Sequence, residues 1–204
     1  MTTTVGFVCS DGVVLATDTR VTAGGFVAHK RAKKLVQVDE HLAVTMSGGW
    51  ADCQHVIENL QFQARLYKLE RGRPMPVQSA ARIVSNMVFS SRYNPFIAVI
   101  LVGGYDKNGG SLYNLDFFGS IVKDDVSSTG SGSPVALGVL EEGYEKRMTV
   151  ARGVPLAANA IITAMRRNVY TGDHFDIAVI DRSGFKEISE AEKDGFVSKF
   201  ASRN

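Results

Sequence analysis

The chain has 204 residues, 45% of them hydrophobic and 22% charged, and a formal net charge of +2. That length and apolar content allow a full buried core, so we expect a single domain over residues 1–204. The charges are mixed in sign and form no basic stripe, which argues against nucleic-acid partners. No apolar run reaches the roughly 18 residues that a membrane span needs, so no membrane partner is expected either.

The cysteine count points to a reducing compartment. Cys9 and Cys53 are the only cysteines, too few for a disulfide framework. The N-terminus lacks the charged and then apolar pattern of a signal peptide. We therefore expect a cytoplasmic protein.

The first fifty residues have the pattern of a sheet. Apolar, β-branched runs at 3–8 and 12–17 flank the turn signal Ser10-Asp11-Gly12 and predict a β-hairpin. This hairpin would place Thr2 and Asp18 at the same end. Further strands of the same sheet are expected at 26–29, 34–38 and 41–46.

The rest of the chain alternates between helical and strand patterns, apart from the tail from Ala191 onward, which is too polar to predict an element. Two layers of helices and two sheets that each need a cover predict an α+β fold of four layers, with helices outside two stacked sheets. The expected helices are 51–69, 77–89, 133–146 and one capped by Thr149. A second sheet is expected from strands at 96–103, 111–117 and 120–123, and a last strand at 175–181.

The N-terminal residues carry a candidate nucleophile. Removal of Met1 would leave Thr2 with a hydroxyl and a free α-amine on one residue. Such an amine titrates near ~8, so close to neutral pH it can take the proton of the hydroxyl directly or through a water. The alternative interpretation is the start of an edge strand, where β-branched residues are common.

Five segments, in this order and at these separations, resemble a proteasome core-particle β subunit of the archaeal type. None of them is specific alone, and the resemblance extends from Thr2 to about Ile188. It implies an N-terminal-nucleophile hydrolase fold, a four-layer α-β-β-α sandwich, in agreement with the predicted layers. The segments are Thr2-Thr3-Thr4-Val5-Gly6, Ala16-Thr17-Asp18-Thr19-Arg20-Val21-Thr22, Lys33-Lys34-Leu35, Met46-Ser47-Gly48 and Ser128-Thr129-Gly130-Ser131-Gly132-Ser133-Pro134.

The resemblance implies a catalytic trio. Thr2 matches the nucleophile, Lys34 the cation beside it, and Asp18 the carboxylate that holds Lys34. A lysine near the terminal amine lowers the proton affinity of that amine, while Asp18 offsets the cost of burying the lysine. Without the resemblance, Asp18 and Lys34 would be interpreted as an ordinary cross-strand ion pair. Arg20 is expected to be an orienting or structural cation near Asp18.

Gly48 and Ser131 match two further positions. The N–H of Gly48 would face the oxyanion, and a glycine suits a site that a peptide approaches closely; otherwise Gly48 is only a turn after a strand. Ser131 would stand beside the terminal amine and relay protons; otherwise it belongs to a loop that leads into a helix.

The implied substrate pocket is apolar and would accept a large hydrophobic side chain, although its residues could also be ordinary core residues. They are Val21, Ala32, Val36, Met46 and Trp50, the last of which is bulky enough to fill part of the pocket.

Two features depart from the family. Where its members have an aspartate and a serine three residues apart before a glycine, this chain has Asn168 and Thr171 before Gly172. Asparagine still accepts a hydrogen bond, but the negative charge is gone, which predicts slow catalysis. Members also release their threonine by cleavage after a glycine, whereas only Met1 precedes Thr2.

Two functions therefore stay open: a threonine endopeptidase, or an inactive or weakly active structural β subunit beside an active paralogue. The resemblance implies stacked seven-membered rings with α subunits and other β subunits, an ATP-dependent unfoldase, unfolded polypeptide substrates and no cofactor. The loop before Pro134 could also bind phosphate at a helix N-terminus, but it lacks the P-loop lysine. No metal-ligand spacing is found among His29, His41, His55 and His174.

Overall fold

The computed structural model describes residues 2–201, and its framework is two antiparallel five-stranded sheets. The first sheet has the strand order β10-β1-β2-β11-β12. Its strands are β1 Thr4–Val8, β2 Gly12–Asp18, β10 Val126–Thr129, β11 Phe175–Asp181 and β12 Gly184–Glu187.

The second sheet has the order β5-β6-β7-β8-β9, and a separate two-stranded ribbon, β3-β4, lies near the N-terminus. The strands of the sheet are β5 Leu35–Asp39, β6 Leu42–Gly48, β7 Ala98–Asp106, β8 Gly109–Leu115 and β9 Ile121–Asp124. Those of the ribbon are β3 Val21–Ala23 and β4 Phe26–His29.

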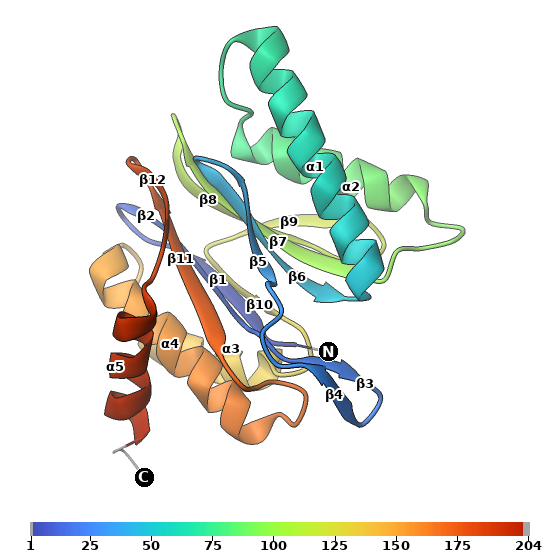
Figure 1. The fold of residues 1–204 in the computed structure, drawn as a ribbon. Helices are drawn as coiled ribbons and strands as arrows, with labels where there is room; N and C mark the ends of the chain where they lie inside the picture. The colour runs from blue at the N-terminus through green and yellow to red at the C-terminus, as the bar shows by residue number, and fades with distance from the viewer. Residues whose placement is uncertain (1, 202–204) are drawn as a thin grey trace.

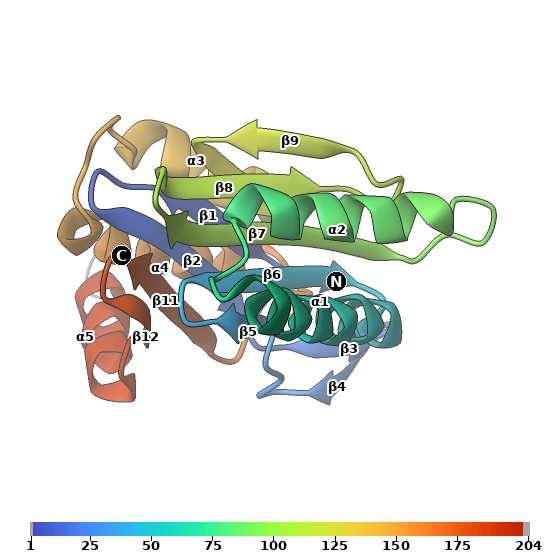
Figure 2. The same cartoon turned by 90° about the horizontal axis from the view of Figure 1, so that it is seen from above.

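Helices cover the outer face of each sheet and complete a four-layer sandwich (Figure 1). Over the second sheet lie α1 Trp50–Arg71 and α2 Val77–Ser90, and over the first lie α3 Ser133–Gly143 and α4 Val150–Arg167. A last helix, α5 Glu190–Ala201, packs beside α4. The view from above in Figure 2 shows the two helical layers on opposite sides of the sheets.

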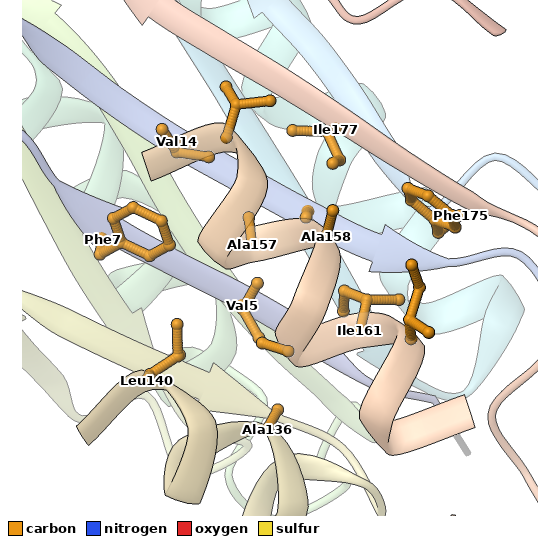
Figure 3. Packing of buried hydrophobic residues seen from close by; sticks show 14 of the residues in the cluster. Val5, Phe7, Val14, Ala136, Leu140, Ala157, Ala158, Ile161, Phe175 and Ile177 are labelled. Atoms are coloured by element: carbon orange, nitrogen blue, oxygen red, sulfur yellow. The ribbon is translucent and has the colours of Figure 1, made fainter. Parts of the chain in front are cut away.

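Three buried apolar clusters hold these layers together. The first lies between the first sheet and α3 and α4, and Figure 3 shows Phe7 and Val14 facing Ala157 across it. The second lies under α1 and α2, and the third, which includes Leu15 and Leu101, lies between the two sheets. Because β2 is covered on both faces, all seven of its residues are buried. This explains its continuous apolar run from Val13 to Ala16.

The pairing confirms the predicted hairpin but corrects the predicted sheets. β1 pairs with β2, with Thr4 opposite Thr17. The expectation that the first fifty residues form one sheet is wrong, because β6 pairs with β7, with Met46 opposite Ile100. The strands predicted at 96–123 thus extend the sheet of β5 and β6. The free edges of the hairpin are instead filled by β10 and β11, from much later in the chain.

Several short elements were not predicted. β3, β10 and β12 have only three or four residues each, too few for a clear alternation. Helix α5 forms in the tail for which no element was predicted. Thr149 does precede α4, but its side chain makes no capping bond; Asp11 instead accepts a hydrogen bond from the N–H of Val150 at 2.8 Å. Within residues 2–201, no helix is both long and apolar enough to cross a membrane.

Candidate active site

Both sheets contribute to the site around Thr2. Thr2 lies two residues before the start of β1, and Asp18 ends the neighbouring strand β2, so the hairpin register places them at one end. Lys34 immediately precedes β5 in the other sheet, where its carbonyl accepts a hydrogen bond from the N–H of Met46 at 3.0 Å. The site therefore lies between the two sheets and forms only when they are stacked.

Thr2, Asp18 and Lys34 are in mutual contact and almost fully buried. Lys34 Nζ donates to Asp18 Oδ1 at 2.8 Å and also contacts Thr2 Oγ1. Thr2 Oγ1 lies 3.1 Å from the same carboxylate oxygen. The exposed fractions are 2% for Thr2, 0% for Asp18 and 3% for Lys34. An ordinary surface ion pair is exposed to water, whereas the Lys34–Asp18 pair is buried, so each of its charges depends on the other for compensation.

The charge of Asp18 is balanced by backbone groups as well as by Lys34. Its Oδ1 accepts from the N–H of Thr3 at 3.0 Å. Its Oδ2 accepts from the N–H groups of Arg20 and Gly172 at 3.2 and 3.1 Å. Burial lowers the pKa of Lys34 below its usual value, against the opposing effect of Asp18. Lys34 is thus a cation that holds its proton less tightly than a surface lysine does.

On the other side of Thr2 lies a hydrogen-bond network without charge. Asn168 Oδ1 accepts from Ser131 Oγ at 3.1 Å and from Thr171 Oγ1 at 3.0 Å. Thr171 Oγ1 in turn lies 2.7 Å from Thr3 Oγ1. Ser131 Oγ also points to the carbonyl of Thr2 at 3.5 Å. The network therefore contacts both Thr2 and Thr3.

Asn168 uses both ends of its amide. Its Nδ2 donates to the carbonyl of Ser131 at 3.1 Å, while its oxygen also accepts from the N–H of Tyr170 at 3.1 Å. An aspartate could accept these bonds but could not donate to a carbonyl. The departure at this position is consequently a different hydrogen-bonding arrangement, with no polar group of Asn168 left unpaired.

Gly48 ends β6 with a backbone conformation that requires glycine. Its φ is 132°, and a Cβ at this position would lie 2.1 Å from the carbonyl oxygen of Ile97. Any other residue would both strain the backbone and collide with the neighbouring chain. The absence of a side chain leaves the backbone open to an approaching peptide.

A cavity of about 210 Å³ opens beside Thr2 and Gly48. Three of the five predicted pocket residues line it, whereas Ala32 and Val36 do not. Val36 packs against the core beneath α1 and α2 instead, and the N–H of Ala32 bonds the carbonyl of Thr19 at 2.9 Å. The complete lining is Thr2, Val21, Thr22, Lys34, Met46, Ser47, Gly48, Gly49, Trp50 and Cys53.

Cys53 also lines this cavity, and a thiol is a possible competing nucleophile. Its side chain is 1% exposed, and burial, with the nearby charge of Asp52, raises the pKa of the thiol to about 12. Near neutral pH it is therefore protonated, and a thiol is a poor nucleophile in that form. Of the two groups, the hydroxyl of Thr2 is the better placed to react, because Lys34 and Asp18 contact it.

Other hollows of the described chain lie away from the trio of Thr2, Asp18 and Lys34. A larger hollow of about 700 Å³ is lined by the turn regions that include Met75, Tyr105 and Phe185, and none of the predicted site residues lines it. Among residues 2–201 no three His, Cys, Asp or Glu side chains cluster as metal ligands. Met1, whose removal the mechanism needs, lies outside the described residues.

Two residues at the site were missed by sequence reasoning. Thr3 joins the neutral network, and Asp173 binds Arg20 with an Nε–Oδ2 distance of 2.9 Å. Thr3 was hidden in a run of three threonines, of which only the first had a role. Asp173 follows Gly172 in a loop, and no local pattern connects it with a strand end more than 150 residues earlier.

Comparison with known proteins identifies the family. A family model described as proteasome subunit matches residues 1–180. The proteasome subunit beta of Methanococcus aeolicus is 44% identical over 193 residues, which cover 94% of this chain and 89% of that protein. The proteasome subunit beta 2 of Nitrosopumilus maritimus is 42% identical over 196 residues, covering 96% and 93%. The chain therefore belongs to the proteasome subunit family and is a relative of archaeal β subunits.

Proposed function

We propose that this chain is a threonine endopeptidase subunit of a proteasome core particle, with Thr2 as the nucleophile. The observation that carries the proposal is the buried contact of the Thr2 hydroxyl with Lys34 and Asp18, at the wall of a cavity that Gly48 also lines. A structural threonine at the start of a strand would need neither a buried cation nor an adjoining cavity.

The reaction is acyl transfer in two stages. Thr2 Oγ attacks the carbonyl carbon of the scissile peptide bond while the α-amine of Thr2, freed by removal of Met1, takes the hydroxyl proton. The C–N bond then breaks, and the leaving amine receives that proton. Water, activated by the same amine, hydrolyses the resulting ester and restores the hydroxyl. No cofactor is required for either stage.

Lys34 and Gly48 lower the barrier of these steps electrostatically. The cation of Lys34 disfavours a second positive charge on the nearby amine, which keeps that amine available as a base. Asp18 fixes Lys34 in place through the 2.8 Å ion pair. The N–H of Gly48 is the group we assign to the oxyanion that forms on the attacked carbonyl.

The cavity supports a preference for hydrophobic side chains before the cleaved bond. Val21, Met46 and Trp50 supply apolar wall. A charged substrate side chain would lose its hydration there, and the charged lining residue Lys34 is already paired with Asp18. Trp50 lines the cavity and is 42% exposed. We expect its bulk to favour medium-sized over large aromatic side chains.

The assembly that we propose follows from the family. We expect the chain to form seven-membered rings with other β subunits, stacked on rings of α subunits, in the cytoplasm. An ATP-dependent unfoldase would supply unfolded polypeptide as substrate. Exposed apolar side chains on the outer helices and turns, such as Phe62, Leu69, Phe89 and Phe118, offer surface for these contacts.

A second candidate function is that of a structural β subunit that completes the ring beside an active paralogue. It is favoured by Asn168, which leaves the network around Ser131 without a charge. Against it stands the complete pairing of Asn168, Asp18 and Lys34, which a subunit without catalytic activity has no need to keep.

The decisive comparison is between the parent and Thr2→Ala, each assembled with α subunits. We expect the parent to cleave hydrophobic fluorogenic peptides and Thr2→Ala to assemble equally well without cleaving them. Thr163→Ala removes the same kind of hydroxyl from the half-buried side of α4 and should leave the rate unchanged. An assembled parent without activity would favour the structural subunit, and an active Thr2→Ala would rule out Thr2 as the nucleophile.

A further inference from the structure

One side chain, Arg20, connects the end of β2 with the loop that follows α4. Its guanidinium binds residues near both ends of that loop. Nη1 donates to the carbonyl of Val169 at 2.8 Å, and Nε donates to Asp173 Oδ2 at 2.9 Å. Nη2 adds a longer bond of 3.4 Å to the other oxygen of Asp173. The exposed fractions of the two side chains are 23% and 16%, so the pair is partly shielded from water.

The backbone of Arg20 belongs to the charged trio at the same time. Its N–H donates to Asp18 Oδ2, and its carbonyl accepts from Lys34 Nζ. Arg20 is thus joined through its main chain to the groups that hold the nucleophile, and through its side chain to the loop that holds Ser131.

The conformation of the 168–173 loop brings Asp173 into contact with Arg20. Asp173 has a φ of 66°, a left-handed conformation that residues other than glycine adopt uncommonly, aspartate and asparagine more often than most. A Cβ on the preceding Gly172 would lie 2.4 Å from the Arg20 guanidinium, so a side chain there would displace Arg20 from its present position. In this conformation the N–H of Gly172 reaches Asp18 Oδ2 at 3.1 Å. The conformation of the loop thus lets Gly172 bind Asp18 while Asp173 binds Arg20.

We propose that Asp173, through Arg20, is a positioning residue for catalysis: the pair holds the 168–173 loop against the end of β2. With the pair intact, Gly172 supports Asp18, and Thr171 and Asn168 present Ser131 to the first residues of the chain. Asp173 touches neither Thr2 nor the cavity beside it. Its effect is therefore on the geometry of the reacting groups and not on substrate binding. The consequence for turnover rests on the proposed peptidase function.

The test compares Asp173→Asn and Arg20→Gln with the parent in the assembled particle. Asparagine tolerates a positive φ and keeps the size of the side chain, so Asp173→Asn removes only the charge. We expect kcat for a hydrophobic peptide to fall about tenfold in each variant, with KM within twofold, because the cavity is untouched. The double variant should be no slower than the slower single one, since the two residues act as one unit. Glu145→Gln breaks an exposed arginine–carboxylate pair with Arg152 and should leave both constants unchanged.

The pH dependence separates this role from a general loss of stability. Burial lowers the pKa of Lys34, whereas the charges of Asp18 and Asp173 raise it and the charge of Arg20 lowers it. The midpoints of the pH–rate profile should therefore move to lower pH in Asp173→Asn and to higher pH in Arg20→Gln. Opposite shifts with an unchanged kcat would mean that the pair acts on Lys34 only through its charges, which would overturn the positioning role.

Amide hydrogen exchange supplies a readout that does not need activity. In Asp173→Asn, peptides covering 169–174 should exchange faster than in the parent, while those from β7 should not change. If the parent proves inactive but this local change occurs, the positioning role stands and the peptidase proposal fails. Unchanged exchange in the loop, or an unchanged kcat in an active particle, would overturn the positioning role. Should Asp173→Asn fail to assemble, exchange on the unassembled chain decides in the same way.

Discussion

Asp18 and Asn168 hold the two sides of Thr2 by different means. Asp18 carries a charge into a position that is 0% exposed, and Lys34 and three backbone N–H groups balance it. Asn168 carries no charge and binds hydroxyl, N–H and carbonyl groups through both ends of its amide. The charged side depends on every partner, because a buried charge without its counter-charge is far more costly than a broken neutral hydrogen bond. The neutral side should tolerate more change.

The largest effect is expected from Lys34→Met, which keeps most of the side-chain volume and removes the charge. Peptidase activity should disappear, and the free energy of unfolding should fall by about 3 kcal/mol because Asp18 is left uncompensated. Denaturant titration and peptide cleavage measure the two effects, with Lys123→Met on the exposed side of β9 as the control. A Lys34→Met chain as stable as the parent would show that the backbone N–H groups alone satisfy Asp18.

A smaller effect is expected on the neutral side. Asn168→Ala removes the acceptor of three hydrogen bonds, and we expect kcat/KM to fall about tenfold, equivalent to about 1.4 kcal/mol. From the sequence alone, we would predict that Asn168→Asp speeds cleavage, because it restores the charge of the aspartate that family members have at this position. The geometry predicts the opposite, because the new carboxylate would face the Ser131 carbonyl to which the amide now donates.

We therefore expect Asn168→Asp to be slower than the parent but faster than Asn168→Ala. The three chains are compared as assembled particles, with the amount of assembled protein measured for each. An Asn168→Asp particle faster than the parent would mean that the charge outweighs the lost donor, and the contrast between the two sides of Thr2 would then disappear.

The smallest effect is expected from the thiol in the cavity. Because burial raises the pKa of Cys53 to about 12, iodoacetamide at pH 8 should leave the peptidase rate within twofold of the untreated particle. Cys9, whose pKa is also raised to about 12, should be equally unreactive, and both thiols should be alkylated once the chain is denatured. Inactivation together with an adduct on Cys53 in the native particle would show that the thiol is accessible and ionised.

The fold could be predicted from the sequence where the signal is local. The β1–β2 hairpin, the long helices and the four layers follow from apolar periodicity and turn residues. Which strands share a sheet could not be predicted in this way, because β1 and β2 find their outer partners more than 100 residues later. Helix α5 has a weak apolar face, but Ser189 and Glu192 bond each other's backbone N–H groups in a capping box, a sequence signal that could have located its start.

The same limit applies to the site. The trio of Thr2, Asp18 and Lys34 was named from motifs, and the structure brings these three side chains together. The Arg20–Asp173 pair depends on a loop conformation that only the folded chain defines. Of the residues predicted for the substrate pocket, Val21, Met46 and Trp50 line the cavity beside Thr2, whereas the neighbouring strand residue Val36 packs against the helical core.

The most direct test of the central claim is to find the nucleophile chemically. The assembled particle is treated with a hydrophobic peptide that ends in a vinyl sulfone, and the modified residue is located by mass spectrometry of the intact and the digested chain. We predict one adduct per chain on Thr2, in a chain that has lost Met1, and no adduct on Thr2→Ala. An adduct on Cys53, or an assembled and unmodified chain that keeps Met1, would contradict the assignment of Thr2 as the catalytic nucleophile.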